Sequence, residues 1–324
     1  MLYPIKFKPI LKDKIWGGSK LNKVLKKSGA GVHCGESWEI SGIQGDISIV
    51  LNGVLKGNSL QELIEIYMGD LVGDSVYEKF GDEFPLLIKF IDASDVLSIQ
   101  VHPDDEFSGK NHGAYGKTEM WYIINADEDS TIITGFKKTV DKKAYIDLVK
   151  KNKLINILNF EKVKSGDVFF IPSGRVHSIG KGILLAEIQQ TSDVTYRIFD
   201  WNRKDNNGNL RELHNDLASE VIDFSVPPTY RTDYLSYPET TIKMIHCEFF
   251  NSNILQFNQI VEKNYNLIDS FIIYICLEGE FTIDHQNQKT KITEGETVLL
   301  PAILKNIHLI PLKASKLIEI YIKI

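Results

Sequence analysis

The sequence predicts a mainly β protein built from two related β-barrels, with a small helical insertion in the first. Short apolar stretches recur along the 324 residues, and in several of them polar and apolar residues alternate strictly, which is the period of a β-strand. A pattern of glycine, an acidic residue, four apolar-compatible residues and proline occurs twice. From about residue 240 the chain reads as strand after strand with short turns. This repeated plan favours two related barrels.

The composition is that of an ordinary globular protein, with 43% hydrophobic and 25% charged residues. The formal net charge of -6 gives no basic excess, so we expect no nucleic-acid partner. No run approaches the ~18 apolar residues of a membrane span, and the N-terminus lacks the apolar core of a signal peptide. The three cysteines show no metal-binding spacing, as is typical of a reducing compartment. We therefore expect a soluble, cytoplasmic protein with no membrane partner.

The N-terminal region is expected to alternate between extended and helical segments. Residues 1–18 are extended and apolar, and Ser19 could cap a short helix over residues 20–27. Alternation over Gly35–Ser41 predicts a half-buried strand. Ser59 precedes a helix whose apolar residues recur on one face. These residues are Leu60, Leu63, Ile64 and Tyr67.

A single lysine interrupts the next apolar run. Phe84–Asp92 reads as a buried strand that contains Lys89. A charge within such a run is costly unless it is paired or faces a cavity. Lys89 is either an edge lysine whose ammonium reaches water or a cation that faces a polar pocket, and this segment leaves both interpretations open.

The stretch from Leu97 to His102 is the most informative in the chain. Apolar and polar residues alternate in it, so Ser98, Gln100 and His102 share one face of the predicted strand. A solvated face usually carries Lys, Glu or Thr, whereas this face carries a hydroxyl, an amide and an imidazole. These are binding groups, and we interpret the strand as one wall of a cup that holds a metal ion.

Further strands follow a polar loop. Residues 109–116 are rich in glycine and predict a mobile loop. Lys117–Ile124 then reads as a strand on which Lys117 and Glu119 share a face. The period changes to that of a helix at about residues 138–160, which predicts a helical insertion between strands.

The first copy of the repeated pattern delivers a second histidine. Gly166–Pro172 predicts a turn and a short strand, and the following turn leads to His177. Another apolar strand carries Glu187, and Asp193 follows it. We expect one more helix over residues 209–222, with Asn209 as its candidate N-cap.

The second copy, Gly295–Pro301, is not accompanied by the candidate metal ligands of the first. Five residues after its proline stands Asn306, where the first copy has His177. No Gln-x-His strand precedes it. Around residues 226–238 the chain reads as a linker. We therefore expect a catalytic domain over residues 1–235 and a degenerate barrel without a metal site over residues 236–324.

A metal site with cationic neighbours is the hypothesis that these observations favour. Two imidazoles and a carboxylate suit zinc and other first-row divalent ions, and an amide oxygen is a weaker neutral ligand. Cations beside such a site imply an anionic substrate carrying phosphate or carboxylate. The candidate ligands are Gln100, His102, Glu119 and His177, and the cations are Lys89, Lys117 and Arg197.

Four segments carry a family resemblance. The chain resembles the type I mannose-6-phosphate isomerases over its whole length, and most of all their short bacterial form; the Gln-Val-His-Pro-Asp-Asp motif is highly specific. The resemblance implies cupin-like, jelly-roll barrels with a reduced helical insertion. It also implies one zinc ion per chain, held by the four candidate ligands. The segments are Lys14–Gly18, Gly35–Ser41, Ser98–Asp105 and Lys117–Tyr122.

The resemblance also implies roles for individual residues. The implied reaction interconverts mannose 6-phosphate and fructose 6-phosphate by proton transfer through a cis-enediol. Enterobacterial members have a histidine where Gly116 stands, so any role of that histidine does not transfer. The implied catalytic residues are Lys117, Arg197 and Glu187, and the implied substrate-binding residues are Ser98, Lys89, Asp193 and Trp16.

Several alternatives stay open at this point. Either Lys117 or Glu187 could be the base. Two histidines and a carboxylate also suit an Fe(II) oxygenase-type cupin, and a sugar-phosphate-binding sensor without catalysis is a third class. A small-molecule sugar phosphate is the expected partner, and we expect a monomer or a weak homo-oligomer.

Overall fold

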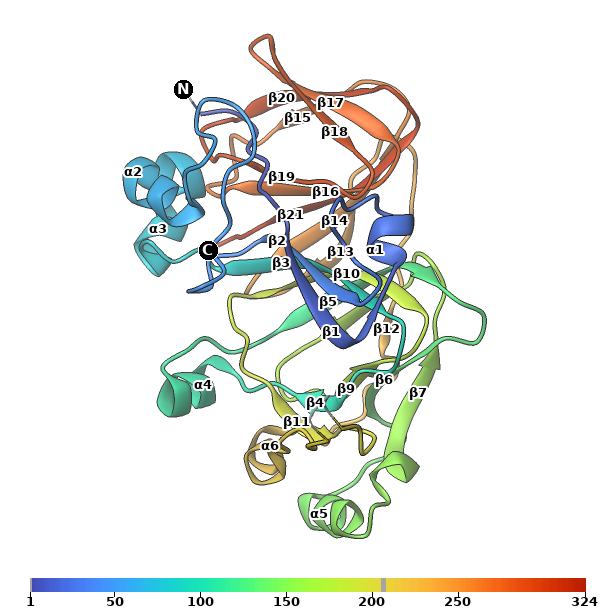
Figure 1. The fold of residues 1–324 in the computed structure, drawn as a ribbon. Coiled ribbons are helices and arrows are strands. Elements are labelled where there is room, and N and C mark those ends of the chain that lie inside the picture. The colour runs from blue at the N-terminus through green and yellow to red at the C-terminus, as the bar shows by residue number, and fades with distance from the viewer. Residues whose placement is uncertain (1, 205–207) are drawn as a thin grey trace.

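The strands between Ile10 and Thr232 form two antiparallel sheets, and we call this larger part of the fold its first half. The computed structural model describes residues 2–204 and 208–324 (Figure 1). A seven-stranded sheet has the order β1-β2-β3-β10-β5-β8-β12, and a five-stranded sheet has the order β11-β4-β9-β6-β7. The strands of the larger sheet are β1 (Ile10–Gly18), β2 (Cys34–Ile40), β3 (Leu86–Ala93), β5 (Glu119–Ala126), β8 (Val168–Ile171), β10 (Ile183–Gln190) and β12 (Arg231–Thr232). Those of the smaller sheet are β4 (Ile99–Val101), β6 (Thr131–Phe136), β7 (Leu158–Lys162), β9 (His177–Ile179) and β11 (Tyr196–Phe199).

The second half repeats this arrangement with two more sheets. Their orders are β13-β14-β21-β16-β19 and β15-β20-β17-β18. The mainly β fold class predicted from the sequence is therefore confirmed. The strands are β13 (Ile242–His246), β14 (Asn251–Phe257), β15 (Val261–Asn264), β16 (Ile272–Glu278), β17 (Glu280–His285), β18 (Gln288–Thr293), β19 (Thr297–Leu300), β20 (Asn306–Pro311) and β21 (Ser315–Tyr321).

The four sheets stack as layers, with an apolar cluster in each gap (Figure 1). The middle cluster joins the halves, since Phe90 of β3 and Ile320 of β21 both belong to it. One face of the seven-stranded sheet therefore packs on the second half, while its other face carries Lys89 and Glu187 toward the smaller sheet. The expectation of a half-buried strand over Gly35–Ser41 was wrong: every residue of β2 is buried, because both faces of its sheet are covered.

The helices lie at the periphery and agree only partly with the sequence predictions. α2 begins directly after Ser59, whose side chain forms a capping box with Glu62. The predicted helix over residues 20–27 ends at Lys23, and Ser19 makes no side-chain cap hydrogen bond. The helices are α1 (Lys20–Lys23), α2 (Leu60–Val72), α3 (Asp74–Phe80), α4 (Asp105–His112), α5 (Lys142–Lys150) and α6 (Asn215–Val221), with a 3₁₀ helix over Leu154–Ile157.

Two further segments differ from expectation, while the insertion is confirmed. α5 and the 3₁₀ helix stand between β6 and β7, as predicted. The loop expected over residues 109–116 is helical up to His112, because Asp104 caps α4 by accepting a hydrogen bond from the Phe107 N–H at 2.8 Å. The helix expected over residues 209–222 begins only at Asn215, because the residues before it hydrogen-bond to β11.

The strand registers show how closely the halves correspond. Trp121 lies between Glu187 and Phe169 in neighbouring strands, and Tyr274 lies likewise between Glu319 and Val298. The repeated sequence pattern therefore marks the same strand pair in each half. Division of the chain near residue 235 remains our proposal, and the last strand of the first half ends at Thr232 while β13 begins at Ile242.

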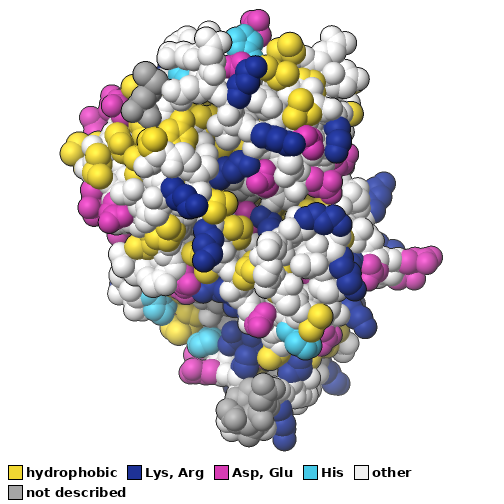
Figure 2. Space-filling view, turned by 45° about the horizontal axis from the view of Figure 1, so that its top comes forward, with side chains coloured by type: hydrophobic (Ala, Val, Ile, Leu, Met, Phe, Trp, Pro, Cys, Tyr) yellow, Lys and Arg dark blue, Asp and Glu magenta, His cyan; other side chains and the backbone are white. Residues whose placement is uncertain are grey.

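On the face of the molecule drawn in Figure 2, lysine and arginine side chains are interspersed with acidic ones. Among the described residues, the structure has no helix of the length and apolarity that crossing a membrane requires.

Candidate active site

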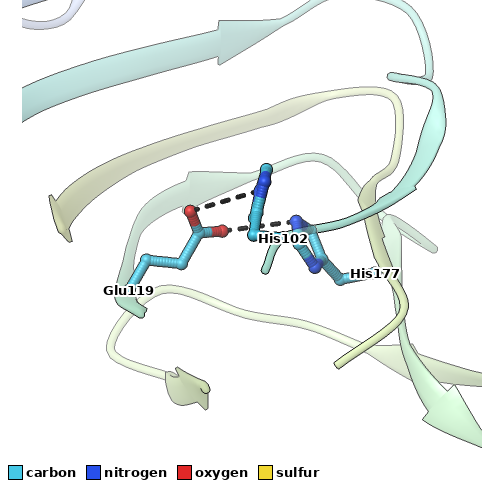
Figure 3. A group of neighbouring side chains, drawn as sticks. All are labelled: His102, Glu119 and His177. Atoms are coloured by element: carbon cyan, nitrogen blue, oxygen red, sulfur yellow. Dashed lines mark ion pairs between the residues drawn. The ribbon is translucent and has the colours of Figure 1, made fainter. Parts of the chain in front are cut away.

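Three buried side chains from different strands meet between the two sheets of the first half (Figure 3). Glu119 begins β5, His177 begins β9, and His102 directly follows β4. The Glu119 carboxylate lies between the imidazoles, with Oε1 3.4 Å from His177 Nε2 and Oε2 3.7 Å from His102 Nε2. One ligand atom of each residue lies within 4.8 Å of the others. The sequence prediction that these three residues come together is thus correct.

The hydrogen bonds of the two histidines direct each Nε2 toward Glu119. His102 Nδ1 lies 2.9 Å from the Val194 carbonyl oxygen, and His177 Nδ1 lies 2.8 Å from that of Arg175. A carbonyl only accepts, so each Nδ1 carries the proton and each Nε2 presents a lone pair. Burial and the ammonium of Lys117 lower the pKa of His102, and burial lowers that of His177 to about 4. Both rings are therefore neutral near pH 7, as metal ligation requires.

The carboxylate of Glu119 completes a donor set that fits a divalent metal. Both of its oxygens are buried, and neither accepts a hydrogen bond from the described residues. Burial and the nearby Glu187 raise the pKa of Glu119 to about 7. A buried carboxylate without hydrogen bonds is costly, and a cation between Glu119 and the two Nε2 atoms would remove that cost.

Gln100, the fourth expected ligand, lies beside this group. It stands directly opposite His177 in the register of β4 and β9. Its Nε2 is 3.3 Å from His177 Nε2, and its Oε1 accepts a hydrogen bond of 3.3 Å from Ser98. To bind a metal, Gln100 would have to present its amide oxygen to the ion. A flip of the side-chain amide, which exchanges Oε1 and Nε2, would provide this orientation. The role of Gln100 as a ligand stays a prediction.

Lys89 and Glu187 form a buried ion pair on the other wall of the site. Lys89 Nζ is 2.8 Å from Glu187 Oε1, and Trp121 donates a hydrogen bond of 2.8 Å to Oε2. Burial disfavours the charged form of both side chains. The charges of Glu187 and Glu36 nevertheless raise the pKa of Lys89. The charges of Lys89 and Lys117 lower the pKa of Glu187. Of the two interpretations of Lys89, the structure supports the pocket cation, because β3 is an interior strand and Lys89 lines a cavity.

A cavity of about 330 Å³ joins these groups. It collects every residue that we expected to act in catalysis or substrate binding. Glu119 and the two histidines lie behind its wall, next to Lys117, whose Nζ is 3.3 Å from His102 Nε2 and 3.4 Å from Glu119 Oε2. The expected residues on the wall are Trp16, Lys89, Ser98, Gln100, Lys117, Glu187, Asp193 and Arg197.

Comparison with known proteins places the chain in a family. Residues 5–138 match the model of the phosphomannose isomerase type I catalytic domain, and residues 240–311 match that of the mannose-6-phosphate isomerase cupin domain. Mannose-6-phosphate isomerase ManA of Bacillus subtilis is 37% identical over 92% of this chain and 93% of its own length. The chain belongs to the type I phosphomannose isomerase family.

Other relatives agree with this assignment. Mannose-6-phosphate isomerase of Streptococcus mutans is 34% identical, covering 94% of this chain and 95% of its own. A crystal structure of the Bacillus subtilis mannose 6-phosphate isomerase superposes with a TM-score of 0.90 at 32% identity, over 99% of this chain and 100% of that one. A mutant phosphomannose isomerase from Salmonella typhimurium, 15% identical with a TM-score of 0.82 and full coverage of both chains, shows the shared fold alone.

The cavity of this member of the phosphomannose isomerase family is also lined by residues that we did not predict. Lys14, Glu36, Trp38, Thr195 and Arg211 also line it. The Glu36 carboxylate lies 3.3 Å from the Lys14 ammonium and accepts a hydrogen bond of 2.7 Å from the Trp38 indole N–H. Glu36 and Trp38 stand two residues apart and line the cavity together, which the interpretation of this segment as a half-buried strand did not predict.

Arg197 and Gly116 show how the backbone shapes the site of this family member. Arg197 lies opposite Gln100 in the register of β11 and β4, so the two side chains leave the sheet on the same face, and both line the cavity. Gly116 precedes Lys117, and a Cβ there would lie 2.5 Å from the backbone carbon of Asp104. The close approach requires glycine, which explains why no histidine stands beside Lys117 in this chain.

Proposed function

We propose that this chain interconverts mannose 6-phosphate and fructose 6-phosphate in the cavity described above. One observation carries the proposal: a buried group of two histidines and a carboxylate adjoins a cavity rich in cations, in a chain of the type I phosphomannose isomerase family. A volume of about 330 Å³ is within the usual range for small-ligand sites. The cations favour an anionic sugar over a neutral one. They are Lys14, Lys89, Lys117, Arg197 and Arg211.

We further propose that one zinc ion per chain binds to Gln100, His102, Glu119 and His177. Two imidazole nitrogens, a carboxylate and an amide oxygen form a donor set that zinc accepts. When bound, such an ion supplies Lewis-acid stabilisation of the negative charge that develops on the substrate oxygens. The burial of the Glu119 carboxylate, which in the described part of the chain has only the Lys117 ammonium at 3.4 Å as a charge partner, and the orientation of the two imidazoles support this assignment.

The reaction moves two protons within the sugar. One proton leaves C2 and arrives at C1, and another passes from the C2 hydroxyl to the C1 oxygen, through a cis-enediol. Of the titratable side chains on the cavity wall, Lys117 and Glu187 are the two candidates for the proton carrier that the sequence suggested. Lys89 and Trp121 already occupy both oxygens of Glu187, and Lys89 lowers its pKa. That makes Glu187 a weak base near neutrality, so we favour Lys117 as the proton carrier.

The remaining residues would bind and orient the substrate. Arg197 offers a planar fork for oxygens near Gln100. Glu187 holds Lys89 in place, so the ammonium can donate to a hydroxyl without moving. Substrate-binding roles for Ser98, Lys89, Asp193 and Trp16 rest on their position in the cavity lining.

A coupled assay with mannose 6-phosphate, before and after chelation, tests the function. We expect turnover that a chelator abolishes and zinc restores. Oxygen consumption with Fe(II) in place of isomerisation would favour the oxygenase-type alternative, and binding of the sugar phosphate without turnover would favour the sensor. Either result would overturn the isomerase assignment.

We also propose that the protein acts in the cytoplasm as a monomer or a weak homo-oligomer, with a small-molecule sugar phosphate as its partner. The absence of paired cysteine spacing motivates the compartment. Sedimentation of the purified protein tests the oligomeric state.

A further inference from the structure

We propose that Arg211, held by Asp200, binds the substrate phosphate together with Arg197. This inference deepens the proposed function and rests on it. It assigns the phosphate to the part of the cavity wall that Arg197 and Arg211 line.

The chain before α6 brings Arg211 beside Arg197. The His214 N–H donates to the Arg197 carbonyl oxygen at 2.7 Å, and the Arg197 N–H donates to His214 Nδ1 at 3.1 Å. The Arg197 guanidinium also donates to the Glu212 carbonyl oxygen at 3.0 Å. Residues 212–214 thus lie along β11, and Arg211 reaches the same cavity wall as Arg197.

Asp200 fixes the orientation of the Arg211 guanidinium. Arg211 Nε donates to Asp200 Oδ2 at 2.6 Å, and Nη2 donates to Oδ1 at 2.5 Å. This is a two-point contact with a carboxylate that is only 4% exposed. One edge of the guanidinium is therefore occupied, and the group is held in place before any substrate arrives, which reduces the entropy lost on binding.

Positive charge is in excess at this part of the cavity wall. Arg197, Arg203 and Arg211 share the buried carboxylate of Asp200, while the other acidic groups nearby, Asp95 at 3.8 Å from Arg203 and Glu212, are exposed to solvent. Burial and the neighbouring Arg211 lower the pKa of Arg197, which is the direction expected when guanidinium groups crowd together. The Nε of Arg197 is buried, and it has no hydrogen-bond partner among the described residues. Asp193 also lines the cavity, but it is exposed to solvent.

The part of the cavity wall around Lys89 and Lys14 offers less to a phosphate. The positive charge of Lys89 is already compensated by Glu187, at 2.8 Å, and by the nearby Glu36. The ammonium of Lys14 is likewise 3.3 Å from the Glu36 carboxylate. A phosphate there would face two buried carboxylates. The charge balance thus favours the two arginines over Lys89 and Ser98 as the groups that bind the phosphate.

A matched pair of variants tests the proposal in the metal-loaded, full-length protein. Arg211→Ala and Arg203→Ala each remove one guanidinium from Asp200, but only Arg211 lines the cavity. We would measure kcat and KM for mannose 6-phosphate and the inhibition constant of inorganic phosphate. Arg211→Ala should raise KM and the inhibition constant about 10- to 100-fold, as expected for a lost charge-assisted contact, with kcat within about threefold. Arg203→Ala should change each by less than about threefold, and Arg211→Lys should retain part of the affinity.

Other results would overturn the assignment. Equal effects of Arg211→Ala and Arg203→Ala would show that both act through Asp200. A phosphate inhibition constant raised by Ser98→Ala and unchanged in Arg211→Ala or Arg211→Lys would place the phosphate beside Lys89 and Ser98 instead. If the wild type fails to isomerise mannose 6-phosphate, the proposed function fails. Calorimetric binding of inorganic phosphate to the same variants still tests the arginine pair in that case.

Discussion

Lys89 and Glu187 stand directly opposite each other in the register of β3 and β10, and their side chains form an ion pair of 2.8 Å. Both side chains are almost fully buried, at 8% and 4% exposure. Every residue of the two strands is buried as well. The two charges therefore depend on each other for compensation within the protein.

Removing one member of this pair should destabilise the fold. Breaking a buried ion pair typically costs about 3–5 kcal/mol, because the remaining charge is left uncompensated. We expect Lys89→Met and Glu187→Gln each to lower the free energy of unfolding by roughly this amount, and the double variant to lower it by less than their sum. Urea denaturation measures all three, and simple additivity would show that the two charges do not interact.

Metal removal should lower both stability and activity. Without an ion, the buried carboxylate of Glu119 has only one ion-pair partner among the residues that the structure describes, the Lys117 ammonium, 3.4 Å from its Oε2, to offset its charge. We expect chelation to reduce the melting temperature by roughly 5 °C and to abolish turnover. Metal analysis of the untreated protein should give one equivalent per chain, because the second copy of the repeated pattern has Asn306 where the first copy has His177. Two equivalents would contradict a metal-free second half.

His102→Ala should remove metal and activity together, because His102 Nε2 faces Glu119 while its Nδ1 is bound to a carbonyl. His308→Ala is the matched control, since His308 is half exposed and lies in the second half. Elemental analysis and the coupled assay report on both variants. Full activity in a metal-free His102→Ala protein would eliminate the metal hypothesis.

Lys117→Ala should separate chemistry from metal binding. The ammonium lies near His102 and Glu119 without being a metal ligand. We expect kcat to fall about 10²- to 10⁴-fold, with metal content unchanged. Lys110→Ala, at an exposed position on α4, serves as the control. Near-normal kcat in Lys117→Ala would leave Glu187 as the proton carrier.

Asp200 should contribute stability that acid removes. Burial opposes its ionisation, but hydrogen bonds from Arg211 and Arg203 outweigh this and lower its pKa. A carboxylate with a lowered pKa stabilises the fold above its unfolded-state pKa of about 3.9, and this contribution is lost as the pH falls through the folded-state value. Wild type and Asp200→Asn should differ in free energy of unfolding at pH 6, and the difference should shrink below about pH 4. A constant difference from pH 6 to pH 3 would argue against this linkage.

Strand periodicity predicted the site correctly where one face of a strand carries binding groups and the other face packs in the core. It placed Ser98, Gln100 and His102 on a shared face, and the repeated glycine-to-proline pattern predicted strand pairs that recur in both halves. It failed for β2, because alternation cannot distinguish a face covered by solvent from one that lines a cavity. The face of β2 that carries Glu36 and Trp38 lines the cavity, and the alternation gave no sign of this.

Other features depend on long-range contacts that local patterns do not encode. Arg211 lies in an irregular segment, and its position depends on Asp200 and on backbone hydrogen bonds to β11. α4 has only a weak apolar stripe, although Asp104 as N-cap and acidic residues in the first turn were visible in the sequence. Capping residues were a better guide there than hydrophobicity.

The apolar cluster between the two halves has a consequence for variants far from the cavity. It includes Phe90 and Ile188 from the sheet that carries the site, and Ile273 and Ile320 from the second half. Loss of packing in residues 240–324 would therefore weaken the folding of both halves at once. Substitutions there should reduce the amount of folded enzyme in a cell while each surviving molecule turns over at the normal rate.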